Sequence, residues 1–131
     1  MHADRLNGIS GEIVDAALVV HREVGPGLLE SVYEVVLAHE LKQRGLEVRR
    51  QVPVPIEFRG IRFDEGYRLD LIVEDSVIVE IKSTEAITGV HKKQLLTYLK
   101  LMKKPLGLLL NFNTELMKDG ISRIANNLPE N

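Results

Sequence analysis

The sequence predicts an α/β sandwich in which a mixed sheet is covered by helices, with the element order ααβββαβα. Three observations predict this fold class. Residues 9–45 carry two apolar stripes at helical spacing. Residues 48–82 contain apolar and β-branched runs that turn residues interrupt, as in strands. Residues 91–112 combine a third helical stripe with a short apolar run that is typical of a buried strand.

Two helices are predicted in the N-terminal third of the chain. Apolar residues recur at the helical period over residues 9–24, Asn7 or Ser10 can serve as the N-cap, and the GPG sequence at 25–27 ends the segment. The second helix stops at Gly45, because glycine and nearby basic side chains favour a helix C-terminus. Its apolar stripe consists of Leu29, Val32, Tyr33, Val36, Leu37 and Leu41.

The middle of the chain predicts three strands. Residues 48–58 alternate loosely and contain two prolines, which favour an edge or irregular strand. Arg59-Gly60 is a turn signal, and the next strand begins at Ile61, is interrupted near Gly66 and resumes as YRLDLIVE. The sequence VIVEIK at 77–82 forms the strand after it.

The C-terminal third predicts a helix, a strand and a last helical segment. A third apolar stripe marks a long helix across 91–104, which Pro105 closes. LGLLLNF at 106–112 is short and strand-like. The chain then forms an amphipathic turn or helix that uses Ile121, Ile124 and Leu128.

Composition favours a single, soluble, cytoplasmic domain that spans residues 1–131. The chain has no Cys, which excludes disulfides and thiolate zinc sites, and no stretch of the ~20 apolar residues that a membrane span requires. Its 17 Lys and Arg against 19 Asp and Glu give a net charge of −2, so a nucleic-acid surface must be local. No phosphate-binding GxxxxGK[ST] loop occurs, and we expect no nucleotide cofactor and no membrane partner. The oligomeric state stays open, a homodimer included.

Three charged residues stand inside the apolar runs of the central hairpin. Glu80 and Lys82 share one face of their strand because residues two apart project together, and Asp70 lies on the neighbouring strand. Buried carboxylates would be satisfied if they held a divalent cation with the lysine beside it. The alternative is a solvent-facing strand edge, since D…ExK is frequent by chance.

The register of this hairpin decides between the two readings. A two-residue Asp75-Ser76 turn would set Asp70 opposite Ile81, on the wrong face for Glu80. We therefore predict a three-residue loop or a bulge, which shifts the pairing by one residue.

The arrangement resembles the PD-(D/E)XK nuclease superfamily. Its core is αβββαβ, with an acidic residue on the second strand, ExK on the third and, in the RecB-like branch, QxxxY on the following helix. Asp70, Glu80 with Lys82, and Gln94 with Tyr98 match these positions.

The sequence is more similar still to the GxxExxY family, whose signature Gly27, Glu30 and Tyr33 reproduce. The resemblance covers roughly residues 6–126, and one departure is Leu69, which stands where the superfamily name has a proline. Further stretches that match are GYRLD at 66–70, LLTYLKL at 95–101 and NFN at 111–113.

The resemblance implies a Mg²⁺-dependent nuclease that hydrolyses DNA phosphodiester bonds, with Mn²⁺ as a substitute and RNA as the alternative polymer. Asp70 and Glu80, with the Ile81 carbonyl, would hold the cation, and Glu30 would reach it or a second one. Lys82 would orient the attacking water or neutralise charge on the phosphate. The rival function is a catalytically inactive nuclease fold that binds nucleic acid or protein.

The resemblance also implies substrate contacts on the third helix and beside the hairpin. Gln94 would steady Lys82 or the substrate, and Tyr98, Lys93 and Arg68 would contact nucleic acid. Each has an ordinary alternative, since Gln94 can be a surface residue, Tyr98 a core residue, and a lysine stripe a solvated face. Glu30 likewise suits a helix N-terminus through the helix dipole. The candidate basic patches are Lys93, Lys100 and Lys104, and Arg59, Arg62 and Arg68.

Three histidines invite a metal-site hypothesis that their spacing does not support. No pair among them has the ligand spacing of a helical zinc site. We therefore expect surface or boundary positions for His21, His39 and His91, with His91 the nearest to the site.

Overall fold

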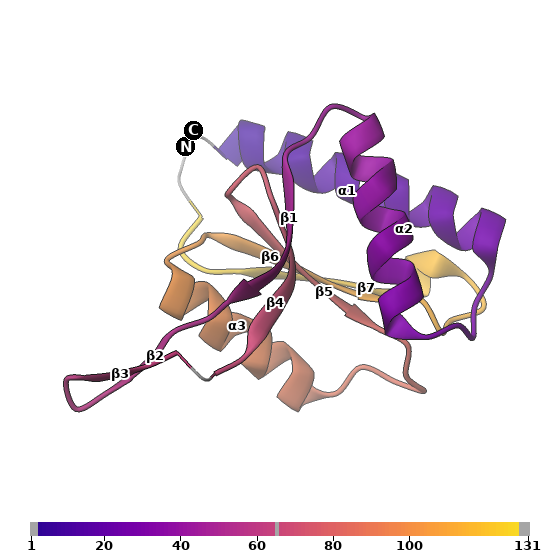
Figure 1. The fold of residues 1–131 in the computed structure, drawn as a ribbon. Coiled ribbons are helices and arrows are strands. Elements are labelled where there is room, and N and C mark those ends of the chain that lie inside the picture. The colour runs from indigo at the N-terminus through magenta and orange to yellow at the C-terminus, as the bar shows by residue number, and fades with distance from the viewer. Residues whose placement is uncertain (1–2, 65, 129–131) are drawn as a thin grey trace.

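The fold was analysed in a computed structural model, which describes residues 3–64 and 66–128 (Figure 1). The helices are α1 (Ala3–Val24), α2 (Glu30–Gln43), α3 (Gly89–Met102) and the short 3-10 helix η1 (Met117–Gly120). The strands are β1 (Val48–Pro53), β2 (Ile56–Phe58), β3 (Ile61–Phe63), β4 (Arg68–Val73), β5 (Val77–Lys82), β6 (Leu106–Asn111) and β7 (Ile121–Ala125).

The main sheet is mixed and five-stranded over the described residues, in the order β1-β4-β5-β6-β7. Strands β1, β4 and β5 are antiparallel neighbours, β6 runs parallel to β5, and β7 returns antiparallel to β6. The parallel pair requires a crossover, which α3 supplies. This mixed α/β architecture is consistent with a PD-(D/E)XK core, as the sequence predicts.

Helices cover both faces of the sheet (Figure 1). One core contains the inward stripes of α1 and α2 with alternate residues of β4, β5 and β6, among them Leu71, Val79 and Leu108. The second core joins α3 to the opposite face through Ile72, Ile78 and their neighbours. Because side chains alternate along a strand, Asp70, Glu80 and Lys82 belong to the α3 face.

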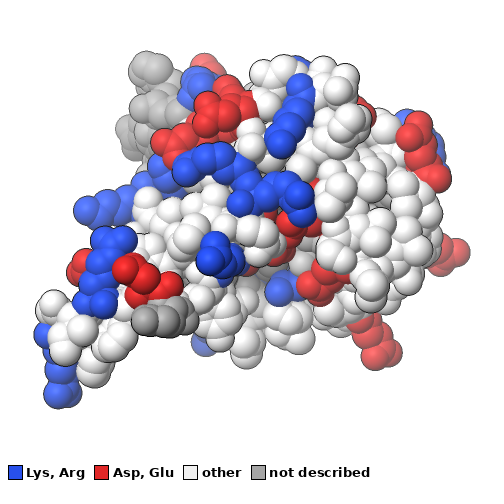
Figure 2. Space-filling model, in the orientation of Figure 1, with Lys and Arg blue, Asp and Glu red and all other residues white. Residues whose placement is uncertain are grey.

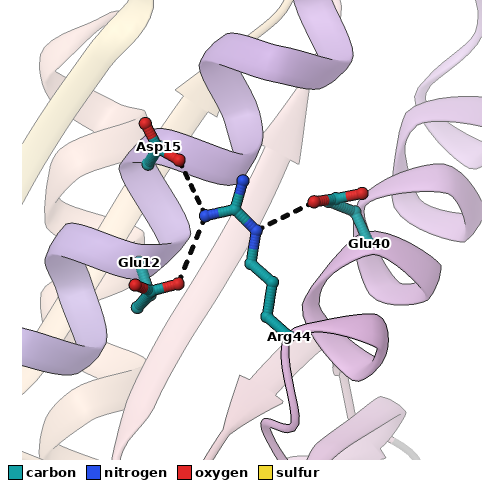
Figure 3. A network of polar contacts seen from close by, with 4 residues as sticks. All are labelled: Glu12, Asp15, Glu40 and Arg44. Carbon is teal, nitrogen blue, oxygen red and sulfur yellow. Dashed lines mark hydrogen bonds and ion pairs between the residues drawn. The ribbon is translucent and has the colours of Figure 1, made fainter.

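Helix α2 is fixed against α1 by a charge cluster at its C-terminal end (Figure 3). The Arg44 guanidinium contacts Asp15 and Glu40 at 2.8 Å each and Glu12 at 3.2 Å. Hydrogen bonds to Glu40 and Asp15 raise the pKa of Arg44 above its ordinary value. The cluster is largely exposed, so its contribution is orientation of α2 more than stability.

Helix α3 lies close to β6 because of a glycine. A Cβ on Gly107 would stand 2.9 Å from a methyl carbon of Leu95, a buried residue of α3. Thr88 and His91 form a capping box at the N-terminus of the helix, which begins two residues before the predicted start at residue 91. The close packing sets the distance between α3 and the charged face of β5.

The structure corrects three predictions. Residues 48–58 form two strands, and β2 pairs only with β3 in a separate two-stranded sheet. The predicted last helix is wrong, because Ile121–Ala125 is β7, which covers the free edge of β6. Helix α1 begins at Ala3, so Asn7 and Ser10 lie inside it and cap nothing.

Candidate active site

The β4–β5 hairpin has the register that the site requires. Val73 pairs with Val77, Ile72 with Ile78 and Leu71 with Val79, which leaves a three-residue loop at 74–76 and confirms the prediction. Glu74 and Asp75 adopt positive φ values of 53° and 51° in this loop. The same register, continued by one residue, sets Asp70 opposite Glu80 on one face.

Beyond Leu71 the two carboxylates replace the backbone ladder between β4 and β5. The Asp70 N–H donates to Glu80 Oε2 at 2.9 Å, and the Ile81 N–H donates to Asp70 Oδ2 at 2.7 Å. Each carboxylate therefore binds the backbone of the opposite strand with one oxygen. The strands are held apart here by side chains, and the two acidic groups are fixed next to each other.

The two carboxylates are electrostatically unfavourable neighbours. Burial and the charge of Asp70 raise the pKa of Glu80 to about 8, against the opposing effect of the Asp70 N–H and Lys82. Burial also raises the pKa of Asp70, and the charges of Glu34 and Glu30 add to it. The pair therefore resists double ionisation, and a bound cation would relieve the repulsion between the two carboxylates.

Lys82 ends β5 on the same face as Glu80. Its side chain is half-buried, and its charge lowers the pKa of both Asp70 and Glu80. Among the described residues, no carboxylate lies within ion-pair distance of its ammonium group. The lysine is therefore close enough to act on the pair electrostatically and still available to a ligand.

Glu30 approaches from the other helical layer. It opens α2, and its Oε1 accepts a hydrogen bond of 3.3 Å from the Ser83 N–H, one residue beyond Lys82. The Ser83 hydroxyl donates to the Leu28 carbonyl at 2.6 Å. Glu30 thus lies at the rim of the site, beside the end of β5.

The sequence matches a known protein family over most of its length. The family model described as "PD-(D/E)XK nuclease superfamily" matches residues 7–124. The chain belongs to the PD-(D/E)XK nuclease superfamily. A comparison with curated proteins gave no match. A solved structure titled "Crystal structure of SSO0001" is 25% identical with a TM-score of 0.48, and the match covers 77% of this chain and 50% of that one. The chain thus corresponds to half the length of that protein.

Asp70, Glu80 and Lys82, which the sequence resemblance matched to the acidic residue and the ExK of the superfamily, lie on one face. No group of three or more metal-ligating His, Asp or Glu side chains is gathered within the described residues, so Glu30 is not brought together with Asp70 and Glu80. The ligand role of Glu30 stays a prediction.

The third helix brings Tyr98 to the acidic pair. Tyr98 is 3% exposed, and burial followed by the charge of Glu80 raises its pKa to about 12. Its ring lies 5.9 Å from that of Tyr67. Gln94 is half-buried one turn earlier, on the same flank of α3. Tyr98 therefore packs in the core and also lies beside the candidate active site.

Gly27 and Tyr33, two positions of the stretch that resembles the GxxExxY signature, have a local structural explanation. Tyr33 is fully buried, donates its hydroxyl to the Gly25 carbonyl at 2.6 Å and accepts the Leu28 N–H at 3.0 Å. Gly27 has a φ of +89°, which favours glycine. Tyr33 therefore fixes the turn that starts α2 and, through it, the position of Glu30.

The basic residues differ in their availability. Lys93 and Lys100 are exposed and make no ion pair with a described residue, whereas Lys104 contacts Asp75 at 3.3 Å. Arg68 is exposed and donates to the Gln51 carbonyl at 3.2 Å. Lys93 and Lys100 thus form a solvated face of α3, whereas Lys104 lies beyond the end of the helix and is paired.

Within residues 3–64 and 66–128, no group of three or more potential metal ligands contains a histidine. His91 Nδ1 accepts the Thr88 N–H, and His39 is exposed. The predicted surface or boundary position of His21 is wrong, because the ring is 8% exposed and donates to the Thr114 carbonyl at 2.8 Å.

Sequence reasoning missed the residues that position the site from outside it. Asn111 is buried and accepts the Thr84 N–H at 3.1 Å while donating to the Thr84 carbonyl at 3.0 Å, which fixes the chain just after Lys82. Asn113 donates to the same carbonyl at 3.3 Å. The signal was the NFN stretch, which the resemblance marked without giving it a role.

Proposed function

We propose that residues 1–131 act as a single metal-dependent nuclease domain of the GxxExxY family, which hydrolyses phosphodiester bonds of DNA. The observation that carries the proposal is the Asp70–Glu80 pair, whose carboxylates are fixed side by side on the face that also presents Lys82. A fold that only needed stability would not bury two adjacent carboxylates without a paired cation.

The residues of the pair fit a hard divalent cation. Each carboxylate uses one oxygen for a backbone N–H, and the second oxygen can serve as a ligand. The Ile81 N–H projects towards β4, and the carbonyl of a strand residue projects to the same edge, so it can complete the set. When bound, Mg²⁺ or Mn²⁺ would polarise the phosphate and acidify a water molecule. A small number of protein ligands is sufficient for Mg²⁺, because the ion retains several waters.

The other residues would act on the substrate. Lys82 would offset the negative charge that develops on the phosphate, since no described carboxylate neutralises it. Gln94 would hold Lys82 or a phosphate oxygen, and Tyr98 would contact the strand from α3. Glu30 would act from the rim, where Ser83 orients it.

A cleavage assay tests the proposal. Single-stranded, duplex, flap and junction DNA, with RNA in parallel, would be incubated with Mg²⁺, Mn²⁺ or EDTA, and Lys82→Ala would be the blank. We expect cleavage that requires the cation and Lys82. Cation-dependent binding without cleavage of any substrate would favour the inactive binding module, and cleavage that persists in EDTA would contradict the mechanism.

A further inference from the structure

The β2–β3 hairpin stands away from the body of the protein (Figure 1). Cross-strand pairing of Phe58 with Ile61 and of Ile56 with Phe63 places these four residues on one side. Ile56 packs against the second core, but Phe58 is 61%, Ile61 59% and Phe63 43% exposed. Two strands alone gain little stability, so three exposed apolar side chains at the tip are better explained as a contact surface.

The turn of this hairpin presents a cation. Arg59 and Gly60 have φ values of +50° and +80°, which is the pattern of a turn that normally takes Asn or Gly at its first position. An arginine in this conformation is strained, and strain in a loop points to a role for the side chain. The Arg59 guanidinium lies 5.1 Å from the Phe58 ring centroid, and no described carboxylate is within ion-pair distance of it.

Aromatic residues continue from the hairpin to the candidate active site. Tyr67 leaves the hairpin stem, where its carbonyl accepts the Val54 N–H at 2.8 Å, and its ring is 61% exposed. That ring lies 5.9 Å from Tyr98, which borders the Asp70–Glu80 pair. Tyr67 precedes Asp70 by three residues, or about 10 Å along an extended strand.

The charge around this path suits a polyanion. Between Gly89 and Met102, α3 contains Lys92, Lys93 and Lys100 and no Asp or Glu, whereas α1 and α2 each carry more acidic than basic residues. Figure 2 shows blue side chains at the tip of the protruding hairpin, where the sequence has arginines and no lysine, with acidic side chains beside them. On the α1–α2 side, Arg44 is paired with three carboxylates.

We propose that the hairpin, with Phe58, Ile61 and Phe63 on its face and Tyr67 at its stem, binds an unpaired nucleic-acid strand and leads it to the carboxylate pair. Rings that are exposed and flanked by Arg take unstacked bases, because every base has a π-face and each phosphate attracts a cation. Bases in a duplex are stacked on each other, so they do not offer these faces. The position of the scissile phosphate rests on the proposed function.

Binding in EDTA tests this surface without cleavage. Fluorescence anisotropy would compare a labelled single-stranded DNA, the same sequence as RNA and a blunt duplex, for wild type and the double variant Phe58→Ala, Phe63→Ala. We expect the double variant to bind both single strands at least about tenfold more weakly, since each stacked base contributes about 1–3 kcal/mol, and the duplex almost as well as wild type. Leu116→Ala, at 54% exposure on the far side of the fold, is the matched control and should bind like wild type.

A second variant keeps the test independent of folding. Asn suits the first turn position, so Arg59→Asn removes the charge while it relieves the strained conformation. We expect several-fold weaker binding of single strands and a lower dependence on salt by about 0.7 in the log–log slope, with Arg59→Lys close to wild type.

Three outcomes would overturn the proposal. The first is unchanged single-strand binding in the hairpin variants, and the second is an equal loss of binding in the Leu116→Ala control. The third is a wild-type dimer that the double variant dissociates, since the hairpin would then be a protein contact. Hydrolysis of bis(4-nitrophenyl) phosphate with Mn²⁺ separates this failure from that of the proposed function. That small substrate needs the carboxylate pair and no hairpin, so its rate should depend on Asp70 and not on Phe58.

Discussion

Glu34 and Glu80 are equally buried, with 6% of each exposed, yet their surroundings treat the two charges in opposite ways. Glu34 Oε2 accepts hydrogen bonds from Arg50 Nε at 3.0 Å and Arg50 Nη2 at 2.9 Å, and Glu34 Oε1 accepts one from the Gln51 amide at 2.6 Å. Glu80 accepts a backbone N–H and faces the Asp70 carboxyl group. Two equally buried glutamates therefore differ in whether a partner compensates their charge. Folding itself compensates the charge of Glu34, whereas that of Glu80 is left for a ligand to compensate.

The two regions are neighbours, which makes the comparison informative. Gln51 lies in β1 with a φ of +53°, between the paired residues Arg50 and Val52, and next to the strand position of Asp70. This strained conformation costs on the order of 1–3 kcal/mol and directs the amide to Glu34. The charge of Glu34 also raises the pKa of Asp70. The structural carboxylate thus contributes to the electrostatic strain at the candidate active site.

The largest expected effect is on catalysis and concerns the Glu80 side of the comparison. Asp70→Asn, Glu80→Gln and Lys82→Ala should each lower cation-dependent cleavage by about 10²–10³-fold or more, because each removes a metal ligand or charge stabilisation. Each variant should remain folded, since none of these changes alters apolar packing. Initial cleavage rates and melting curves measure both. Lys93→Ala is the control, with weaker substrate binding at most, and survival of activity in Lys82→Ala would contradict the assigned roles.

The next largest expected effect is a loss of stability on substitution of Glu34. Glu34→Gln should lower the free energy of unfolding by about 2 kcal/mol, because charge-assisted hydrogen bonds contribute about 1.5–3 kcal/mol and Arg50 is partly solvated. Urea denaturation of wild type and variant measures it. A stability equal to that of wild type would mean that the two buried glutamates do not differ as we describe.

The sequence was sufficient to predict that Asp70, Glu80 and Lys82 share one face, because this arrangement depends on local patterns. Residue alternation places Glu80 and Lys82 on one face, and the choice of loop length settles where Asp70 stands. The carboxylate at Glu34 could not be predicted in the same way. Its partners Arg50 and Gln51 belong to strand β1. Their approach depends on the positive φ of Gln51, which no neighbouring glycine in the sequence indicates.

The wrong elements of the fold have a similar cause. Ile121 and Ile124 are three residues apart, which fits a helical turn, but the free edge of β6 takes the segment as a strand. In residues 48–58 the prolines indicated irregularity, and the break between β1 and β2 lies among them. In the first case a pairing with another strand overrides a weak local pattern, whereas in the second the break follows the local signal of the prolines.

The third prediction compares how a divalent cation changes the stability of variants at the two sites. At about ten times the dissociation constant, Mn²⁺ should stabilise wild type by about 1.4 kcal/mol, or very roughly 3 to 8 °C in melting temperature. Asp70→Asn should lose this gain and, in EDTA, melt no lower than wild type, because it relieves like-charge repulsion. Glu34→Gln should melt lower but keep the gain. Equal cation shifts in wild type and Asp70→Asn, or none in wild type at saturating Mn²⁺, would exclude the metal site.

The last effect is the pH dependence of the apo protein, whose slope is at most about 1.4 kcal/mol for each pH unit. The pKa of Glu80 rises from its ordinary value of 4.5 to about 8 on folding, so the folded state favours the protonated acid. The associated stability is complete below about pH 4.5 and is lost as the pH rises through about 8. In EDTA, the free energy of unfolding of wild type should therefore fall towards pH 8 relative to Glu80→Gln, while Lys93→Ala keeps the wild-type slope. Parallel profiles for wild type and Glu80→Gln would show that Glu80 is ionised in the folded protein without a cation, and its contrast with Glu34 would then disappear.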